Sequence, residues 1–374
     1  MICLAGLPWS FFMVRLLTPF KELDIWHANT WWMQGWILLL AGIHSLNQRP
    51  LAQLPQVCWW MMIWPTLATL WIFTTQLKSG EPYPSGLLLG LANLWSVMLA
   101  LLLMAAWTKA ELTTISTAIF WSGVGLILYG YLQVLNLDQF FKWIDTSKTT
   151  DTLVGTIGNM THFGCQLALW LPFALIQPKL ARWWVLPALI LMVLAHSSTA
   201  LAAVALLLAG WGWSAYPRLK YWVAGTLGMV GIGFLLTNPE WLSFHGRLET
   251  WTEWTAAITQ RPIIGWGLGF VKHLAQTLPT TSSLFAWKHL HNEFFQWWVE
   301  TGIIGVGIGG WMLCNLWQRR RATIASPLKW ACGWSFTLCC LMALLNFPFH
   351  LWQLGGWGLA ALAGWLVCTQ QEMA

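Results

Sequence analysis

About twelve apolar segments, most of them close to twenty residues long, divide the chain, and this is the length an α-helix needs to cross a bilayer. Hydrocarbon offers no partner to backbone N–H and C=O groups, so such segments are confined to helices, which satisfy these groups internally. The spans near 183–196 and 199–216 meet at Ser197-Ser198-Thr199, which predicts a tight hairpin. The predicted spans are 1–20, 29–46, 57–77, 84–107, 112–135, 153–177, 183–196, 199–216, 221–237, 293–317, 328–346 and 350–369.

The charge content supports the same fold class. Only 9% of the 374 residues are charged, whereas a soluble protein has about 25%. The 33 Trp are typical of side chains at the boundary between water and hydrocarbon, although stacking on sugar rings is a functional alternative. We therefore expect an all-α integral membrane protein, a single multi-pass domain over 1–374, without a cleavable signal peptide.

Basic residues orient the predicted helices. With the N-terminus inside, most Lys and Arg of the short connections gather on one face, and such residues stay cytoplasmic. The sequence pI of about 9.0 then reflects topology, and no nucleic-acid partner is expected. One large loop, 238–292, between spans nine and ten, falls on the opposite face. The face assigned to the cytoplasm carries Arg49, Lys109, Lys179, Arg182, Arg218, Lys220, Arg319, Arg320, Arg321 and Lys329.

Histidines concentrate on the face of the large loop. Only His44 lies toward the cytoplasm, and His162 lies in the outer half of its span. Because imidazole is the side chain that ordinarily titrates near neutral pH, this distribution favours the outer face as the chemical face. At or beyond the outer boundary lie His27, His196, His245, His273, His289, His291 and His350.

The large loop has its own pattern. Residues 246–259 predict a helix that places Leu248, Trp251, Trp254 and Ile258 on one apolar face, which would suit a membrane surface. Pro262 ends this helix, and the three glycines that follow permit a tight turn. They follow no strand, so a dinucleotide-binding loop is not indicated. The glycines are Gly265, Gly267 and Gly269.

Polar side chains then mark the start of the tenth span. Asn292 suits a helix N-cap, and Glu293, Gln296 and Glu300 share one helix face. Ionisable groups at a bilayer boundary favour a functional role, although a solvated helix start with one buried, paired Glu is the alternative. His289-x-His291 near Glu293 also permits a metal hypothesis, but no third ligand follows at a recognisable spacing, so neither metal nor cofactor is expected.

Three patterns in this order resemble the O-antigen ligase and polymerase superfamily: Gly-Arg-x-x-x-Trp, then Pro-x-x-Gly-x-Gly-x-x-Phe, then His-Asn with Glu-x-Gly-x-x-Gly, all within 246–305. Upstream, Gly155-Thr156-Ile157-Gly158-Asn159 is similar to the family's Gly-Thr-x-x-Asn. One departure is Ser198-Thr199-Ala200, where the family often has Arg. The resemblance implies a bacterial inner-membrane enzyme with a periplasmic active face.

Such enzymes move a glycan from undecaprenyl diphosphate to an acceptor hydroxyl, with membrane lipids around them and no metal. The resemblance implies that His291 is the general base, with a pKa near ~6.5, and that Glu300 is a second catalytic residue. Arg247 suits the diphosphate because its planar fork binds phosphate oxygens in pairs; an interfacial Arg, or a partner of Glu249, is the alternative. Lys288, Arg261 and Lys272 are candidates for a second positive charge.

Other residues have supporting roles or open ones. Glu293 and Gln296 would orient the base or the sugar. Asn159 and His162 either hydrogen-bond across helices or line the cavity. The favoured acceptor is the lipid A core (a ligase), and the alternatives are another glycan repeat (a polymerase) or a protein hydroxyl (an oligosaccharyltransferase). A transporter or flippase of lipid-linked glycans is the hypothesis from a different class, but no paired, broken halves are apparent.

Overall fold

The computed structural model of the chain describes residues 56–79, 85–138, 153, 155, 157, 159–178, 181–215, 247–271, 289–321, 326–346 and 348–373. Within these ranges every regular element is a helix, which agrees with the predicted all-α class. The predicted spans 1–20, 29–46 and 221–237 lie outside the described residues. Two described helices, Ala110–Val134 and Glu293–Leu316, are long and apolar enough to cross a membrane, so the number of twelve spans stays a prediction.

The described helices coincide with nine predicted spans, most to within a few residues. The exception is the span predicted from residue 153, where the helix begins only at Met160 because Asn159 caps it. The helices are α4 (Gln56–Ser79), α5 (Ser85–Ala105), α6 (Lys109–Val134), α8 (Met160–Leu175), α9 (Val185–Leu194), α10 (Ser198–Ala215), α12 (Arg247–Gln260), α14 (Glu293–Arg321), α15 (Pro327–Ala343) and α16 (Trp352–Met373), with short 3-10 turns η2 (Ala181–Trp184) and η6 (Pro348–His350).

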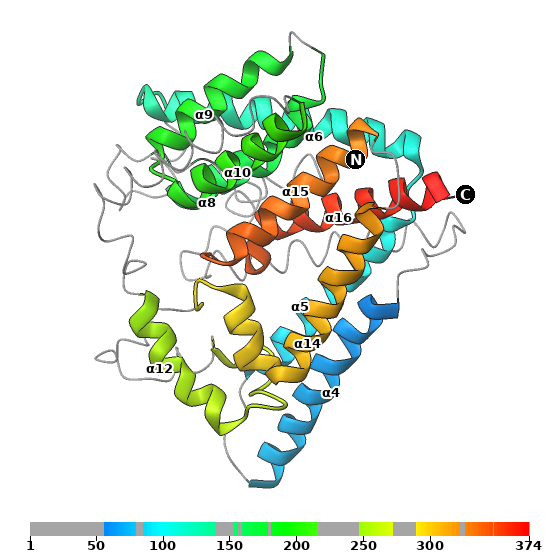
Figure 1. Ribbon diagram of the computed structural model, residues 1–374. Helices are drawn as coiled ribbons and strands as arrows, with labels where there is room; N and C mark the ends of the chain where they lie inside the picture. Colours follow the sequence, from blue (N-terminus) through cyan, green and yellow to red (C-terminus); the bar gives the residue numbers. More distant parts are fainter. Residues whose placement is uncertain are drawn as a thin grey trace.

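Helix α8 forms the centre of the larger helix group, with α6, α9, α10, α15 and α16 packed around it (Figure 1). Its side chain Trp170 is fully buried and donates its indole N–H to the Phe120 carbonyl at 3.0 Å. Ser335 of α15 donates to the Leu169 carbonyl at 2.9 Å. The predicted hairpin is present, because α9 and α10 are joined by residues 195–197.

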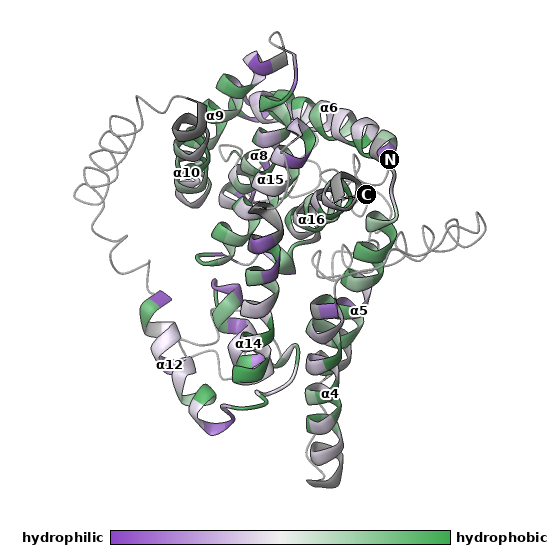
Figure 2. Ribbon diagram, turned by 45° about the vertical axis from the view of Figure 1, so that its right-hand side comes forward, coloured by the Kyte–Doolittle hydropathy of each residue, from purple (hydrophilic) through white to green (hydrophobic). Residues whose placement is uncertain are grey.

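A second group joins α4, α12 and α14, and α5 connects it to the first group by packing on both α4 and α16. In Figure 2, α12 is mostly pale, with a few purple and green residues. The predicted apolar face of α12 packs partly on protein, and its contact with a membrane surface stays a prediction. Trp254 and Ile258 are buried in a cluster with Phe270, but Leu248 is 44% exposed. Docking onto the glycine loop therefore uses the second half of this face.

The predicted span 293–317 is not a single straight helix. Gly302 has φ 69° and ψ −174°, so α14 breaks there into two parts that meet in a sharp bend, and the second part runs along α4 (Figure 1). This conformation is essentially restricted to glycine. The first part, residues 293–301, carries the predicted polar stripe.

The glycine loop, residues 261–271, supplies the hydrogen bonds that the break removes from α14. Trp266 N–H donates to the Val299 carbonyl at 3.0 Å, and Gly267 N–H donates to the Glu300 carbonyl at 2.9 Å. In return, Ile303 N–H donates to the Pro262 carbonyl at 2.9 Å. A broken helix leaves backbone groups that need partners, and the loop satisfies them.

Glycines make this contact possible. A Cβ on Gly265 would lie 2.5 Å from the Glu300 carbonyl carbon, and one on Gly302 would lie 2.1 Å from the Ile263 oxygen. Both residues also have a positive φ. The glycines of this signature thus allow the loop backbone to approach the α14 backbone closely.

We predict that Gly302→Ala destabilises the protein by at least about 2 kcal/mol, because alanine combines a clash with a disfavoured φ. Gly310→Ala is the matched control, since nothing lies within 4 Å of its Cβ and alanine favours a helix by about 1 kcal/mol. Thermal unfolding of both variants in detergent measures the difference. Equal melting temperatures for the two variants would contradict the proposed docking.

Candidate functional site

His291 lies in a left-handed conformation, with φ 51°, directly before α14. A residue other than glycine rarely adopts this region, although Asn, Asp and His do so more than most. Asn292 caps the helix as predicted, because its side-chain oxygen accepts from Phe295 N–H at 2.9 Å. Its carbonyl accepts from Gln296 N–H at 2.9 Å. The cap therefore fixes the peptide that follows His291.

On the other side of His291, both backbone groups of Leu290 are hydrogen-bonded, each to a side chain of a different helix. Its carbonyl accepts the indole N–H of Trp251 at 2.7 Å, and its N–H donates to the Gln296 side-chain oxygen at 3.3 Å. Leu290 itself is 1% exposed. These contacts tie the strained His291 both to α12 and to α14.

Arg247 begins α12, one turn before Trp251, so both residues lie on the same face of the helix. Its guanidinium is half-buried, and its Nε is buried without a hydrogen-bond partner among the residues that the structure describes. Burial lowers the pKa of Arg247, but a guanidinium remains charged at neutral pH. A half-buried cation with an unused donor is a candidate for binding an anion. The alternative pairing with Glu249 involves a side chain outside the described residues.

The charge of Arg247 acts on His291. Burial, then the Arg247 charge, then the neighbouring His162, lower the pKa of His291 to about 3. The structure thus brings together three residues from α12, α8 and the segment before α14. This corrects the expected pKa near 6.5: at every pH well above 3 the imidazole is neutral and can accept a proton.

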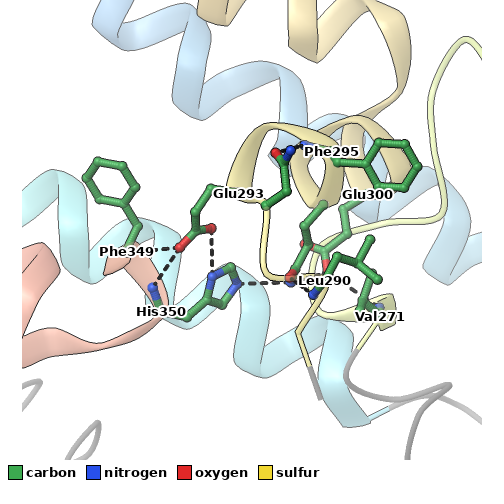
Figure 3. Close-up of polar contacts among 9 residues, drawn as sticks. Val271, Leu290, Glu293, Phe295, Glu300, Phe349 and His350 are labelled. Atoms are coloured by element: carbon green, nitrogen blue, oxygen red, sulfur yellow. Dashed lines mark hydrogen bonds and ion pairs between the residues drawn. The ribbon is translucent and has the colours of Figure 1, made fainter. Parts of the chain in front are cut away.

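The predicted polar stripe of α14 meets a histidine from the last connection (Figure 3). His350 Nδ1 lies 2.8 Å from a Glu293 carboxylate oxygen, and its Nε2 lies 3.1 Å from the Gln296 nitrogen. The same Gln296 nitrogen donates to Glu300 at 3.2 Å. The predicted shared face is confirmed, and it continues into a side chain of a distant segment.

Backbone donors complete this network. The Glu293 carboxylate accepts from Phe349 N–H at 2.8 Å and from His350 N–H at 3.2 Å, and Glu300 accepts from Val271 N–H at 3.4 Å. The ring of His289 lies 4.4 Å from that of His350. In the sequence His350 is distinguished only by its place at the predicted outer boundary.

The candidates for a second cation are not brought to His291 by any described contact. The Arg261 guanidinium lies over the Trp266 ring, 4.3 Å from its centroid, so it stabilises the glycine loop. Lys288 and Lys272 lie outside the described residues. Among the residues that are described, no group of three or more His, Cys, Asp or Glu side chains is placed to hold a metal ion.

Asn159 and His162 lie at the start of α8. The Asn159 side-chain oxygen accepts from His162 N–H at 3.1 Å, which makes Asn159 a cap. Just before it, Gly155 N–H donates to the Gln133 side chain at 2.7 Å, and a Cβ there would lie 2.1 Å from Phe163. The upstream glycine of the motif therefore fixes how α8 begins, and so where His162 lies.

Residues 183–310 match the family described as O-antigen ligase. The matched region contains α12, the glycine loop and the first part of α14, and this supports the resemblance to the O-antigen ligase-like superfamily. His162 and His350 lie outside it. A search of curated proteins finds no match to the chain.

We predict that Trp251→Phe loosens the peptide before His291, because it removes the indole donor to Leu290. Trp266→Phe is the matched control: its indole N–H donates to the Ala257 carbonyl at 2.8 Å, a bond of the same kind that does not involve Leu290. Each loss should cost about 1 kcal/mol. Amide hydrogen exchange at residues 289–292 should rise only in Trp251→Phe, and an equal rise in both would refute the role of Trp251.

Proposed function

We propose that this chain is a membrane glycosyltransferase of the O-antigen ligase type, which transfers a glycan from undecaprenyl diphosphate to an acceptor hydroxyl. The observation that carries the proposal is the placement of a half-buried arginine within electrostatic reach of a neutral histidine. Both residues lie in the segment that matches the ligase family. A cation for the leaving group and a base for the acceptor are the two groups that this reaction needs.

Arg247 is the proposed diphosphate ligand. Its guanidinium can form paired, charge-assisted hydrogen bonds to phosphate oxygens, and burial strengthens such contacts by excluding water. A diphosphate would also supply an acceptor for the Nε that is unused among the described residues. Lys288 and Arg261 stay candidates for a second charge.

His291 is the proposed general base. The acceptor oxygen attacks the anomeric carbon, the bond from that carbon to the diphosphate oxygen breaks, and the hydroxyl proton passes to His291. The lipid diphosphate leaves with the bonding electrons. Because fixed cations such as Arg247 stabilise the leaving group, we expect the transfer to proceed in the presence of a chelator.

Donor binding would also tune the base. Arg247 is one of the groups that lower the pKa of His291. A bound diphosphate carries negative charge that opposes the arginine field, so it would raise this pKa toward its ordinary value. His291 would then become a stronger base only when the donor is in place.

The remaining candidates support this pair. Glu300 accepts hydrogen bonds from the glycine loop and from Gln296, so we propose that it holds the loop against the first part of α14. Glu293 and Asn292 hold the start of α14. Asn159 and His162 would form the part of the site's lining that comes from α8.

The site would face the periplasm, because the distribution of basic residues predicts loop 238–292 on the face opposite the cytoplasm. We favour the lipid A core as acceptor. Another glycan repeat or a protein hydroxyl are alternatives within the same superfamily, and each acceptor is a separate arm of the assay below.

We predict that Arg247→Ala lowers transfer ten- to a hundredfold, since a charge-assisted contact is worth roughly 1.5–3 kcal/mol. Arg247→Lys should recover only part of the activity, because a point charge cannot replace the planar fork. Arg182→Ala is the control for loss of an arginine, because this exposed side chain lies on the face assigned to the cytoplasm and its loss should leave donor use unchanged. Donor titration at equal protein abundance is the measurement. Wild-type activity in Arg247→Ala would exclude it from the diphosphate site.

We predict that His291→Ala abolishes transfer while the protein still binds lipid diphosphate. The assay uses purified protein in liposomes with undecaprenyl-diphosphate glycan, one acceptor per arm, a chelator and no energy source. Because burial and Arg247 lower the pKa of His291 to about 3 in the donor-free protein, its titration alone should cause no loss of kcat/KM for the donor between about pH 5 and 8. Normal turnover of His291→Ala would disprove its role as base. Failure of well-folded wild type to release lipid diphosphate in every arm would favour a transporter.

A further inference from the structure

His350 joins the site from outside the segment that resembles the ligase family. It ends η6, between α15 and α16, and its side chain is 33% exposed. Both ring nitrogens face α14: Nδ1 lies 2.8 Å from Glu293 and Nε2 lies 3.1 Å from Gln296 (Figure 3). The proposed reaction gives this imidazole no task.

We propose that neutral His350 is a positioning residue for glycan transfer. It orients the Gln296 amide, and the amide oxygen in turn accepts from the N–H of Leu290, the residue before His291. The inference rests on the proposed function and extends it to a residue of the last connection. His350 touches neither donor nor acceptor in this proposal. It acts through Gln296.

The hydrogen bonds determine which atoms donate. Leu290 N–H can only donate, so the Gln296 atom it meets at 3.3 Å is the amide oxygen. The Gln296 nitrogen then donates one proton to Glu300 and the other to His350 Nε2. Nε2 must therefore carry a lone pair, and the imidazole proton lies on Nδ1, where it donates to Glu293. One tautomer of neutral His350 satisfies all these contacts.

Protonation of His350 would break this arrangement. A proton on Nε2 would face the Gln296 nitrogen, which is also a donor. If the amide turned over to offer its oxygen, its nitrogen would face Leu290 N–H, and its oxygen would face the acceptor oxygen of Glu300. Without the turn, Gln296 loses its acceptor at His350 and is held less firmly; with the turn, Leu290 N–H, next to His291, loses its acceptor. Acid should thus make the position of His291 less ordered without protonating its ring.

Three titratable groups of the described residues face the His350 ring. Glu293 and Glu300 come from α14, the latter through Gln296, and His289 lies 4.4 Å away, ring centre to ring centre. The Glu293 carboxylate is also held by the N–H groups of Phe349 and His350. These two backbone bonds do not depend on the side chain at position 350, so the connection stays docked when that side chain is changed.

The decisive variant is His350→Gln, because a glutamine can accept from Gln296 but does not titrate. We expect wild-type transfer, measured at low donor concentration, to fall about tenfold for each pH unit in acid once His350 becomes charged. His350→Gln should stay within about threefold of wild type at pH 8 and lose this acid limb. His350→Ala, which offers no acceptor, should be slow at every pH. His289→Gln removes the neighbouring imidazole and should keep the acid limb.

Hydrogen exchange separates this inference from the proposed function. After correction for the intrinsic pH dependence, protection at residues 289–292 should fall in acid in wild type and not in His350→Gln, whether or not any acceptor is used. An unchanged acid limb in His350→Gln would overturn the inference. So would loss of its activity at every pH with normal protection, because the imidazole would then act in the chemistry itself. Wild type that transfers to no acceptor but shows the exchange pattern would refute the proposed function and leave the positioning intact.

Discussion

The break in α14 at Gly302 is the constraint on which the site depends. A continuous helix would use the Val299 and Glu300 carbonyls internally, and the glycine loop would have nothing to bind. Because the helix breaks, these carbonyls accept from Trp266 and Gly267 instead. The loop is thereby fixed against the first part of α14, and α12, which leads into the loop, is fixed with it. The position of Arg247 relative to His291 follows from hydrogen bonds that neither residue makes.

The Leu290 peptide is the point where these constraints meet. Trp251 holds its carbonyl from α12, and Gln296 holds its N–H from α14. A left-handed residue next to it costs conformational energy, which persists only where the surroundings determine it strongly. His291 is such a residue, and on its other side the Asn292 cap fixes the start of α14. A preorganised base is what a transfer between two bulky substrates requires.

Local patterns in the sequence predicted what depends on local physics. Helix α12, the Asn292 cap and the shared face of Glu293, Gln296 and Glu300 follow from periodicity and cap chemistry, and the described residues confirm them. The break at Gly302 was not predicted, because the sequence does not distinguish Gly302 from the other glycines of this apolar helix, such as Gly305 and Gly307, which continue it. Its cause is the loop docked against it, which is a tertiary contact. His350 was missed for the same reason: it lies 54 residues from Gln296 in sequence.

Electrostatics shows this limit most clearly. From sequence alone, a histidine is expected to be a base with its ordinary pKa near ~6.5. The fold places Arg247 and His162 near His291 and buries the ring, and together they lower its pKa to about 3. A base so depressed is weak until a negative charge arrives, so under the proposed function the donor diphosphate would help to activate it. Under the same proposals the response to acid would come from His350, whose two ring nitrogens contact Glu293 and Gln296 of α14. In this arrangement one imidazole would accept the proton, and the other would hold the Gln296 amide in place.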